Sequence, residues 1–308
     1  VGVIDALQNA LVATIPLCSN NTNPCTAPLA TPVALAETAD RKKLYSVNMG
    51  YGTVSVIDTG SDTVINTIPV GNTPIWAQFS PDGLELYVLN QASGTVSVID
   101  TTSDAVVTTL PAGTSPVHMV LDKQFNRLYV VDGASSNNLW IFDASADPPV
   151  ALKTLTVPVA NPTSITVLAN GLKAYVPSQQ ITAPALSSLC PVKTVPCVLS
   201  VVSVGIVNTT SNTVRSTISL TSPVQQVCNP GNVLFTQTGG VRFRTFATSS
   251  ANSNRVYISS CDAGVIHSLN TTTDSLATDL AAPVSSFAPL TATLPPPPQQ
   301  PVFVLPGP

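Results

Sequence analysis

The chain has 308 residues and a mass of 31.8 kDa, and 44% of its residues are hydrophobic, which excludes global disorder. Charged residues make up only 9%, the formal net charge is −4 and the pI is near 4.9. Because the chain has few Lys and Arg residues, it cannot neutralise a phosphate backbone. We therefore expect no nucleic acid partner and little attraction to anionic membranes.

Along the whole chain, the apolar residues occur in short runs that are interrupted by Thr, Ser or Pro. None approaches the roughly 18 residues that span a bilayer, so no transmembrane helix is predicted. The sequence starts at Val1, inside a predicted strand, with no basic or apolar leader before it. We therefore expect either a processed mature chain or a fragment.

A repeat of 42 residues organises the first half of the chain. The spacing recurs in two sets of residues, Tyr45, Tyr87 and Tyr129, and Pro32, Pro74 and Pro116. One unit contains four short runs rich in Val, Ile, Thr and Tyr, at 73–83, 84–90, 94–100 and 104–113. Runs of this kind, closed by Gly, Pro, Asp or Asn, predict strands bounded by turns. Four strands per unit of this length predict one blade of a β-propeller.

The third strand of the unit recurs six times and always ends in Asp or Asn. The closing residues are Asp5, Asp58, Asp100, Asp143, Asn208 and Asn270. A short side chain that accepts a hydrogen bond from a backbone N–H two residues later favours a tight turn. We therefore predict turn residues here rather than a ring of metal ligands, and a fourth strand follows each turn.

The motifs LYSVN (44–48), LYVLN (86–90) and LYVVD (128–132), together with VSVIDT and SPDG, resemble the YVTN-repeat β-propellers. That family contains bacterial and archaeal secreted and surface-layer proteins. The match is close over residues 1–160 and weaker beyond. The resemblance implies an all-β propeller and an extracellular setting more firmly than it implies an activity.

Blade count follows from the starts of the first strands. These are predicted at Pro32, Pro74, Pro116, Pro162 and Pro223, which gives five blades over about 31–283. The N-terminal 17 residues supply a third and a fourth strand, and 283–292 and 301–307 offer a first and a second. We expect residues 1–308 to form one propeller of six blades closed by strands from both termini, or of seven if upstream residues are missing.

Two insertions and a Pro-rich tail interrupt the pattern. Residues 179–200 separate the second and third strands of one unit, and 229–254 enlarge the next unit. The tail covers 293–308. Long insertions project from a propeller and are where a grafted function would lie. Neither insertion contains a recognisable catalytic motif.

Six cysteines predict three local disulfides. The pairs expected from adjacency are Cys18 with Cys25, Cys190 with Cys197, and Cys228 with Cys261. Zinc is disfavoured because the chain has no C-x-x-C pair and only two histidines. Disulfides place the protein outside the cytoplasm, in the extracellular space, at the cell surface or in the periplasm. Three sequons are compatible with glycosylation, at Asn20, Asn208 and Asn270.

Catalytic motifs and cofactor signatures are not found, so we expect no metal, no cofactor and no catalytic residue. A glycosidase needs two opposed carboxyl groups, and the candidates for such a pair are Asp40, Asp82, Asp122 and Asp262. Asp40 and Asp82 match turns of the SPDG type, so a role in turns is the favoured interpretation.

One position of the repeat is expected to line the central channel of the predicted propeller, where its equivalents in different blades come together. It lies two residues after the inner-strand proline and is occupied by Ala34, Trp76, His118, Ser164 and Gln225. We expect Trp76, His118 and Gln225 to meet at one mouth of the channel, where they would contact at most a weak organic ligand. Packing between blades is the competing and favoured interpretation.

Two classes of function remain. The first is a non-catalytic extracellular structural or interaction propeller that self-associates into a filament or surface layer, or binds other surface proteins or glycans. The second is a secreted enzyme, a lactone or ester hydrolase or a quinone-dependent dehydrogenase, with its site at the central channel. Terminal strands that pair within one chain close the ring, and the same strands paired between chains produce a polymer.

Overall fold

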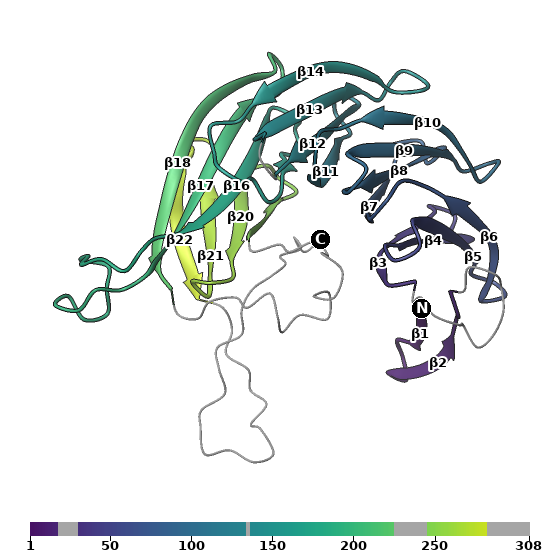
Figure 1. Ribbon diagram of the computed structural model, residues 1–308, viewed down its shortest axis with the longest axis horizontal. Helices are drawn as coiled ribbons and strands as arrows, with labels where there is room; N and C mark the ends of the chain where they lie inside the picture. Colours follow the sequence, from purple (N-terminus) through teal and green to yellow (C-terminus); the bar gives the residue numbers. More distant parts are fainter. Residues whose placement is uncertain (18–29, 134–135, 225–244, 282–308) are drawn as a thin grey trace.

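The computed structural model describes residues 1–17, 30–133, 136–224 and 245–281, and all regular structure in these ranges is β-strand. The 22 strands form five four-stranded antiparallel sheets and one two-stranded sheet. The sheets follow one another in chain order around an arc (Figure 1). The chain is an all-β propeller, as predicted, and each four-stranded sheet is one blade.

The strands of each blade pair in sequence order. Blade 1 is β3 (Pro32–Glu37), β4 (Lys43–Asn48), β5 (Thr53–Asp58) and β6 (Thr63–Pro69). Blade 2 is β7 (Pro74–Phe79), β8 (Glu85–Asn90), β9 (Thr95–Asp100) and β10 (Ala105–Pro111). Blade 3 is β11 (Pro116–Asp122), β12 (Arg127–Asp132), β13 (Asn138–Asp143) and β14 (Val150–Thr156). Blade 4 is β15 (Thr166–Val167), β16 (Lys173–Ile181), β17 (Leu199–Asn208) and β18 (Thr213–Pro223), and blade 5 is β19 (Thr245–Ser249), β20 (Arg255–Ser260), β21 (Val265–Asn270) and β22 (Ser275–Ala281).

The two-stranded sheet is the outer half of a blade. It consists of β1 (Gly2–Asp5) and β2 (Ala10–Thr14), and its register shifts between Val3 and Ile4. The third and fourth strands of every blade shift register at the same place, before Ile57, Ile99, Phe142, Val207 and Leu269. This shared β-bulge identifies β1 and β2 as a third and a fourth strand, as predicted. The strands expected from 283–292 and 301–307 lie outside the described residues.

The Asp or Asn that ends each third strand stabilises the following turn. Its side chain accepts a hydrogen bond from a backbone N–H two or three residues later in all six turns, at Asp5, Asp58, Asp100, Asp143, Asn208 and Asn270. The residue before each fourth strand has a positive φ of about 50° in five of them, at Asn9, Asp62, Asp104, Asn212 and Asp274. The turn prediction is therefore confirmed.

The predicted start of the inner, first strand of blade 5 is wrong. Pro223 ends β18, and the inner strand of blade 5 begins at Thr245, inside the segment predicted as an insertion at 229–254. Strands β17 and β18 are longer than their counterparts and pair as far as Leu199 and Pro223. Proline is tolerated there because β18 is an edge strand, where the absence of a backbone N–H need not remove a hydrogen bond between strands.

Blade 4 also departs from the expected strand starts. Its inner strand is reduced to Thr166–Val167, and Pro162 forms only an isolated bridge with Ser178. In the segment predicted as an insertion at 179–200, β16 continues to Ile181 and β17 begins at Leu199. The part that leaves the sheet is therefore the loop 182–198.

Apolar side chains fill the contact between each blade and the next, which we call a joint. At the first four joints, a residue in the fourth strand or directly after it shares a hydrophobic cluster with a residue of the next blade's third strand. The pairs are Ile15 with Ile57, Ile68 with Ile99, Leu110 with Phe142, and Leu155 with Val207. All eight are buried, and burying one such side chain contributes about 1.5–3 kcal/mol.

Position 94 requires glycine for two reasons, the positive φ of its backbone and the lack of room for a Cβ atom. Gly94 has a φ of +65°, and a Cβ there would overlap the carbonyl oxygen of Gly113. Gly83 has a φ of +76° but no atom within 4 Å of an added Cβ. We expect Gly94→Ala to lower the free energy of unfolding by about 2–4 kcal/mol, and Gly83→Ala by about 1 kcal/mol. Urea unfolding followed by circular dichroism measures both, and equal losses would show that the close approach to Gly113 is unimportant.

Candidate functional site

A polar contact ties the second strand of blade 1 to blade 2. The Lys43 ammonium lies 2.7 Å from an Asp104 carboxylate oxygen, and the Tyr45 hydroxyl donates a hydrogen bond of 2.5 Å to the other oxygen. Burial raises the pKa of Tyr45, and the hydrogen bond to Asp104 raises it further, so this phenol remains a donor. We call this arrangement the latch, because it joins two blades by residues 59 to 61 positions apart.

The latch recurs at other joints with small changes. At the joint of blades 4 and 5, Lys173 and Tyr175 both bind Asp274, at 2.8 and 2.6 Å. At the joint of blades 3 and 4, the Arg127 guanidinium donates to the side-chain oxygen of Asn212 at 3.2 Å. A basic side chain at the start of a second strand therefore meets a polar residue before the next blade's fourth strand.

We expect the buried latch to contribute measurably to stability. Lys173 and Asp274 are largely buried, so Lys173→Met should lower the free energy of unfolding by about 2 kcal/mol. The matched control is Lys42→Met, because Lys42 lies 3.8 Å from Asp40 with both side chains exposed, and its loss should leave the free energy of unfolding almost unchanged. Urea unfolding tests the pair. A loss at Lys173 no larger than that at Lys42 would contradict the latch.

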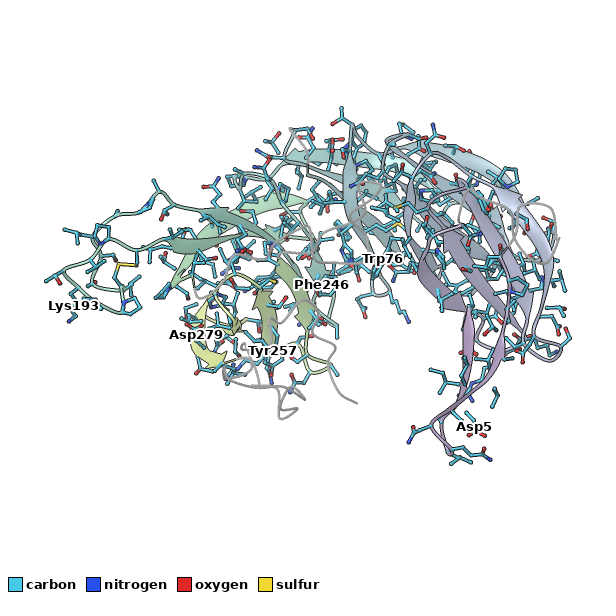
Figure 2. The ribbon with its side chains drawn as sticks, turned by 60° about the horizontal axis from the view of Figure 1, so that its bottom comes forward. Asp5, Trp76, Lys193, Phe246, Tyr257 and Asp279 are labelled. Atoms are coloured by element: carbon cyan, nitrogen blue, oxygen red, sulfur yellow. A yellow bond between two sulfur atoms is a disulfide. The ribbon has the colours of Figure 1, made fainter. Side chains whose placement is uncertain are left out.

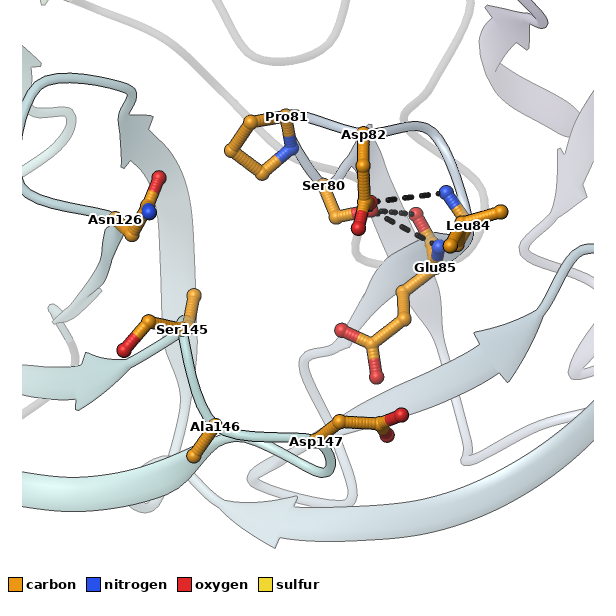
Figure 3. Close-up of a pocket in the computed structure, with 10 residues that line it drawn as sticks. Ser80, Pro81, Asp82, Leu84, Glu85, Asn126, Ser145, Ala146 and Asp147 are labelled. Carbon is orange, nitrogen blue, oxygen red and sulfur yellow. Dashed lines mark hydrogen bonds between the residues drawn. The ribbon is translucent and has the colours of Figure 1, made fainter.

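The joint of blades 2 and 3 has an acidic residue where the others have a basic one. Glu85 is the first residue of β8, as Lys43 is of β4 and Lys173 is of β16. A pocket of about 270 Å³ opens here, lined by Ser80, Pro81, Asp82, Leu84, Glu85, Asn126, Ala144, Ser145, Ala146 and Asp147. Figure 3 shows the Glu85 carboxyl group directed toward Asp147 across this pocket.

The carboxyl groups of the pocket differ in their pKa values. Burial raises the pKa of Glu85, the nearby charges of Asp147 and Asp82 add to this effect, and the 2.7 Å hydrogen bond donated by Tyr87 opposes it. The pKa of Asp82 is lowered, chiefly by the 2.6 Å hydrogen bond from the Ser80 hydroxyl. The pocket thus combines a carboxyl group that holds its proton more tightly with one that stays ionised, a combination suited to proton transfer or to binding a cationic group.

In the described ranges, no group of three or more His, Cys, Asp or Glu side chains is arranged to hold a metal ion. The carboxyl and hydroxyl groups that line the pocket offer hydrogen-bond acceptors and negative charge. A positively charged or hydroxyl-bearing group fits that chemistry.

Stability should depend on pH through Glu85. Because its folded pKa is raised, the wild type is more stable when Glu85 is protonated and loses that stability as the pH rises through the folded pKa. Glu85→Gln removes the charge and can still accept the Tyr87 hydrogen bond. We expect it to be more stable than the wild type at pH 7, with the advantage vanishing below about pH 4.5.

Urea unfolding between pH 4 and pH 8 measures this difference. The matched control is Glu37→Gln, because Glu37 is exposed on β3 and its substitution should leave the profile unchanged. If Glu85→Gln is less stable than the wild type at pH 7, the charge of Glu85 is favourable in the fold and the argument is wrong.

Two of the three predicted channel residues meet on the inner strands. Trp76 on β7 and His118 on β11 have ring centroids 4.8 Å apart, with the planes at 62°. Phe246 on β19 also contacts His118, with the two ring centroids 5.2 Å apart. Gln225 lies outside the described residues. The sequence did not reveal Phe246, because the first strand of its blade was assigned to Pro223.

His118 is held neutral by its burial. Burial lowers its pKa to about 3, and its Nδ1 accepts a hydrogen bond from the Ile165 backbone N–H at 3.3 Å. A neutral imidazole whose Nδ1 accepts carries its proton on Nε2, so neither nitrogen offers a free electron pair to a substrate. This geometry suits packing between blades rather than general base catalysis.

The four carboxylates considered for a glycosidase are distributed over both faces of the propeller. Asp40 and Asp82 lie in the turns between first and second strands of blades 1 and 2, and Asp122 ends β11 before the same turn in blade 3. Asp262 follows β20, in a turn between a second and a third strand, at the opposite face. Asp40 and Asp82 accept backbone hydrogen bonds within their turns.

One predicted disulfide is present. Cys190 and Cys197 are bonded and close the loop 182–198, which projects away from the arc and carries Lys193 near its tip (Figure 2). Cys261 is also disulfide-bonded. Cys18, Cys25 and Cys228 lie outside the described residues, so the other two pairings stay predictions.

Comparison with known proteins supports the fold. No protein-family model matches the sequence, and no match is found among curated proteins. Among solved structures, the chain is similar to hydrazine synthase from Kuenenia stuttgartiensis, with a TM-score of 0.54 and 13% identity over 85% of this chain and 89% of that one. The shared feature is the β-propeller. At this identity the likeness concerns the fold alone.

Proposed function

We propose that the protein is a non-catalytic structural subunit of an extracellular or cell-surface assembly, related to the YVTN-repeat propellers. Self-association into a filament or surface layer is the form of assembly that we favour over binding to other surface proteins or glycans. The low charge of the chain, in which only 9% of the residues are charged, supports this choice, because it offers little repulsion between copies.

The exposed apolar side chains carry the proposal. Ten of the eighteen large apolar side chains that are exposed in the described residues lie in three places: the β1–β2 sheet and its turn, with Ile4, Leu7, Leu11 and Val12; the loop 182–198, with Leu186, Leu189, Val192 and Val195; and β22, with Leu276 and Leu280. Large apolar side chains clustered at the surface mark sites of protein association. The first and third groups lie at opposite ends of the arc (Figure 1).

The loop 182–198 is suited to a contact between molecules. Lys193 is its one charged residue, and the Cys190–Cys197 disulfide restricts its conformations. A restricted apolar tip loses little conformational entropy when it binds, which favours association. The disulfide also fits an oxidising, extracellular setting. Within the described parts of the chain, no helix is long and apolar enough to cross a membrane.

Light scattering coupled to size-exclusion chromatography tests the function. The native protein should grow in mass as its concentration rises, and negative-stain images should show filaments or sheets. Replacing Leu186 and Val192 with Ser should weaken this growth, whereas Leu84→Ser, at an equally exposed leucine of blade 2, should not. A native protein that stays monomeric at millimolar concentration would exclude a structural assembly of like subunits.

A secreted hydrolase is the alternative, and one observation favours it. Glu85 and Asp82 share a pocket with pKa values shifted in opposite directions, which is typical of an acid and base pair. Hydrolysis of ester and lactone substrates by the native protein, lost in Glu85→Gln, would favour this alternative over a structural role.

A further inference from the structure

Leu280 at the end of the arc belongs to a set of residues that are otherwise packed at joints. The fourth strand of each full blade places an apolar residue opposite the residue that lies four positions before the closing Asp or Asn of the third strand: Ile68, Leu110, Leu155, Ile218 and Leu280. The first three are at most 9% exposed, and Ile218 packs partly buried against the cluster of blades 4 and 5. Leu280 is 46% exposed.

Ile4 shows the same departure at the other end. The residue before the closing Asp or Asn of each third strand is Ile4, Ile57, Ile99, Phe142, Val207 or Leu269. The last five are at most 1% exposed, because each faces the preceding blade. Ile4 is 67% exposed.

The two ends also carry the two halves of a latch. Arg255 and Tyr257 begin β20 as Lys173 and Tyr175 begin β16, and Tyr257 is partly exposed whereas Tyr175 is fully buried. Asn9 precedes β2 with a φ of 50°, as Asp104 and Asp274 precede their fourth strands with φ of 51° and 52°. Arginine facing asparagine is the combination already present at the joint of blades 3 and 4.

We propose that the fifth blade of one copy binds the β1–β2 sheet of a second copy, in a joint of the same kind as those within the chain. Leu280 then packs against Ile4, and Arg255 donates a hydrogen bond to the Asn9 side chain. The proposal rests on the proposed assembly function and names the surfaces that carry it. Because the two surfaces differ, repeated contacts run head to tail and build an open filament.

The position of the two surfaces favours a second copy over closure within one chain. Figure 2 places Asp5 far from Tyr257 and Asp279, and Figure 1 places β1–β2 and β22 at opposite ends of the arc. The β1–β2 sheet is fixed to blade 1 by the packing of Ile15 on Ile57. Closing one chain on itself would shift packed joints around the arc, whereas a second copy covers both surfaces without moving them.

Cysteine cross-linking of mixed copies tests the joint. Ile4→Cys and Leu280→Cys are made as separate variants, mixed at assembling concentration and treated with a short bismaleimide. The expected result is a cross-linked dimer in this mixture and none when Leu84→Cys replaces Ile4→Cys, although Leu84 is also more than half exposed. The double variant Ile4→Cys/Leu280→Cys should give a ladder of multimers.

Two results would overturn the proposal. A double variant that cross-links only within one chain shows that the ring closes on itself, and no cross-link in either experiment shows that the two surfaces do not meet. A benchmark variant with Ile68→Cys and Ile99→Cys, which share a joint inside the chain, confirms that the reagent reaches across a joint. Light scattering on the same samples distinguishes failure of this proposal from failure of the proposed function. Assembly without the cross-link would refute the proposed joint but not the self-association of the protein.

Asn9→Asp provides a second test that does not depend on thiols. Aspartate occupies the same backbone conformation at 62, 104 and 274, so the substitution should fold and convert the contact with Arg255 into an ion pair. We expect the concentration at half-assembly to fall by about two- to fivefold, and Arg255→Gln to raise it. Unchanged assembly in both variants would contradict the contact.

Discussion

The structure depends on the apolar contact between the fourth strand of one blade and the third strand of the next. A four-stranded sheet with two apolar faces cannot be stable alone, and it becomes stable when neighbours cover both faces. Ile68 with Ile99 and Leu110 with Phe142 show this contact inside the chain. The same requirement makes the two ends of the arc, where Ile4 and Leu280 are exposed, the surfaces with most to gain from a partner.

Departures from the repeat are where specific chemistry arises. Three joints place a basic side chain against Asp or Asn of the following blade, which holds the blades in register by charge and hydrogen bonding. Glu85 reverses the sign at the joint of blades 2 and 3, and a pocket with several carboxyl groups opens there. The 182–198 loop is a second departure, because its apolar side chains have no counterpart in the other blades.

Local patterns predicted the parts of the fold that local interactions determine. Spacing of Tyr45, Tyr87 and Tyr129 gave the blade length, and the Asp or Asn after each third strand identified the turns. The start of β19 at Thr245 was missed, because its blade has no proline at the inner strand and Pro223 offered a false signal. The latch was missed because Lys43 and Asp104 are 61 residues apart and only the packing of blades brings them together.

Cryo-electron microscopy of the protein at assembling concentration tests the central claim most directly. The account predicts a filament in which the β1–β2 sheet of each copy lies on blade 5 of its neighbour, with Ile4 against Leu280 and Asn9 beside Arg255. A map that shows separate closed rings, each with β1–β2 on the fifth blade of its own chain, would contradict it.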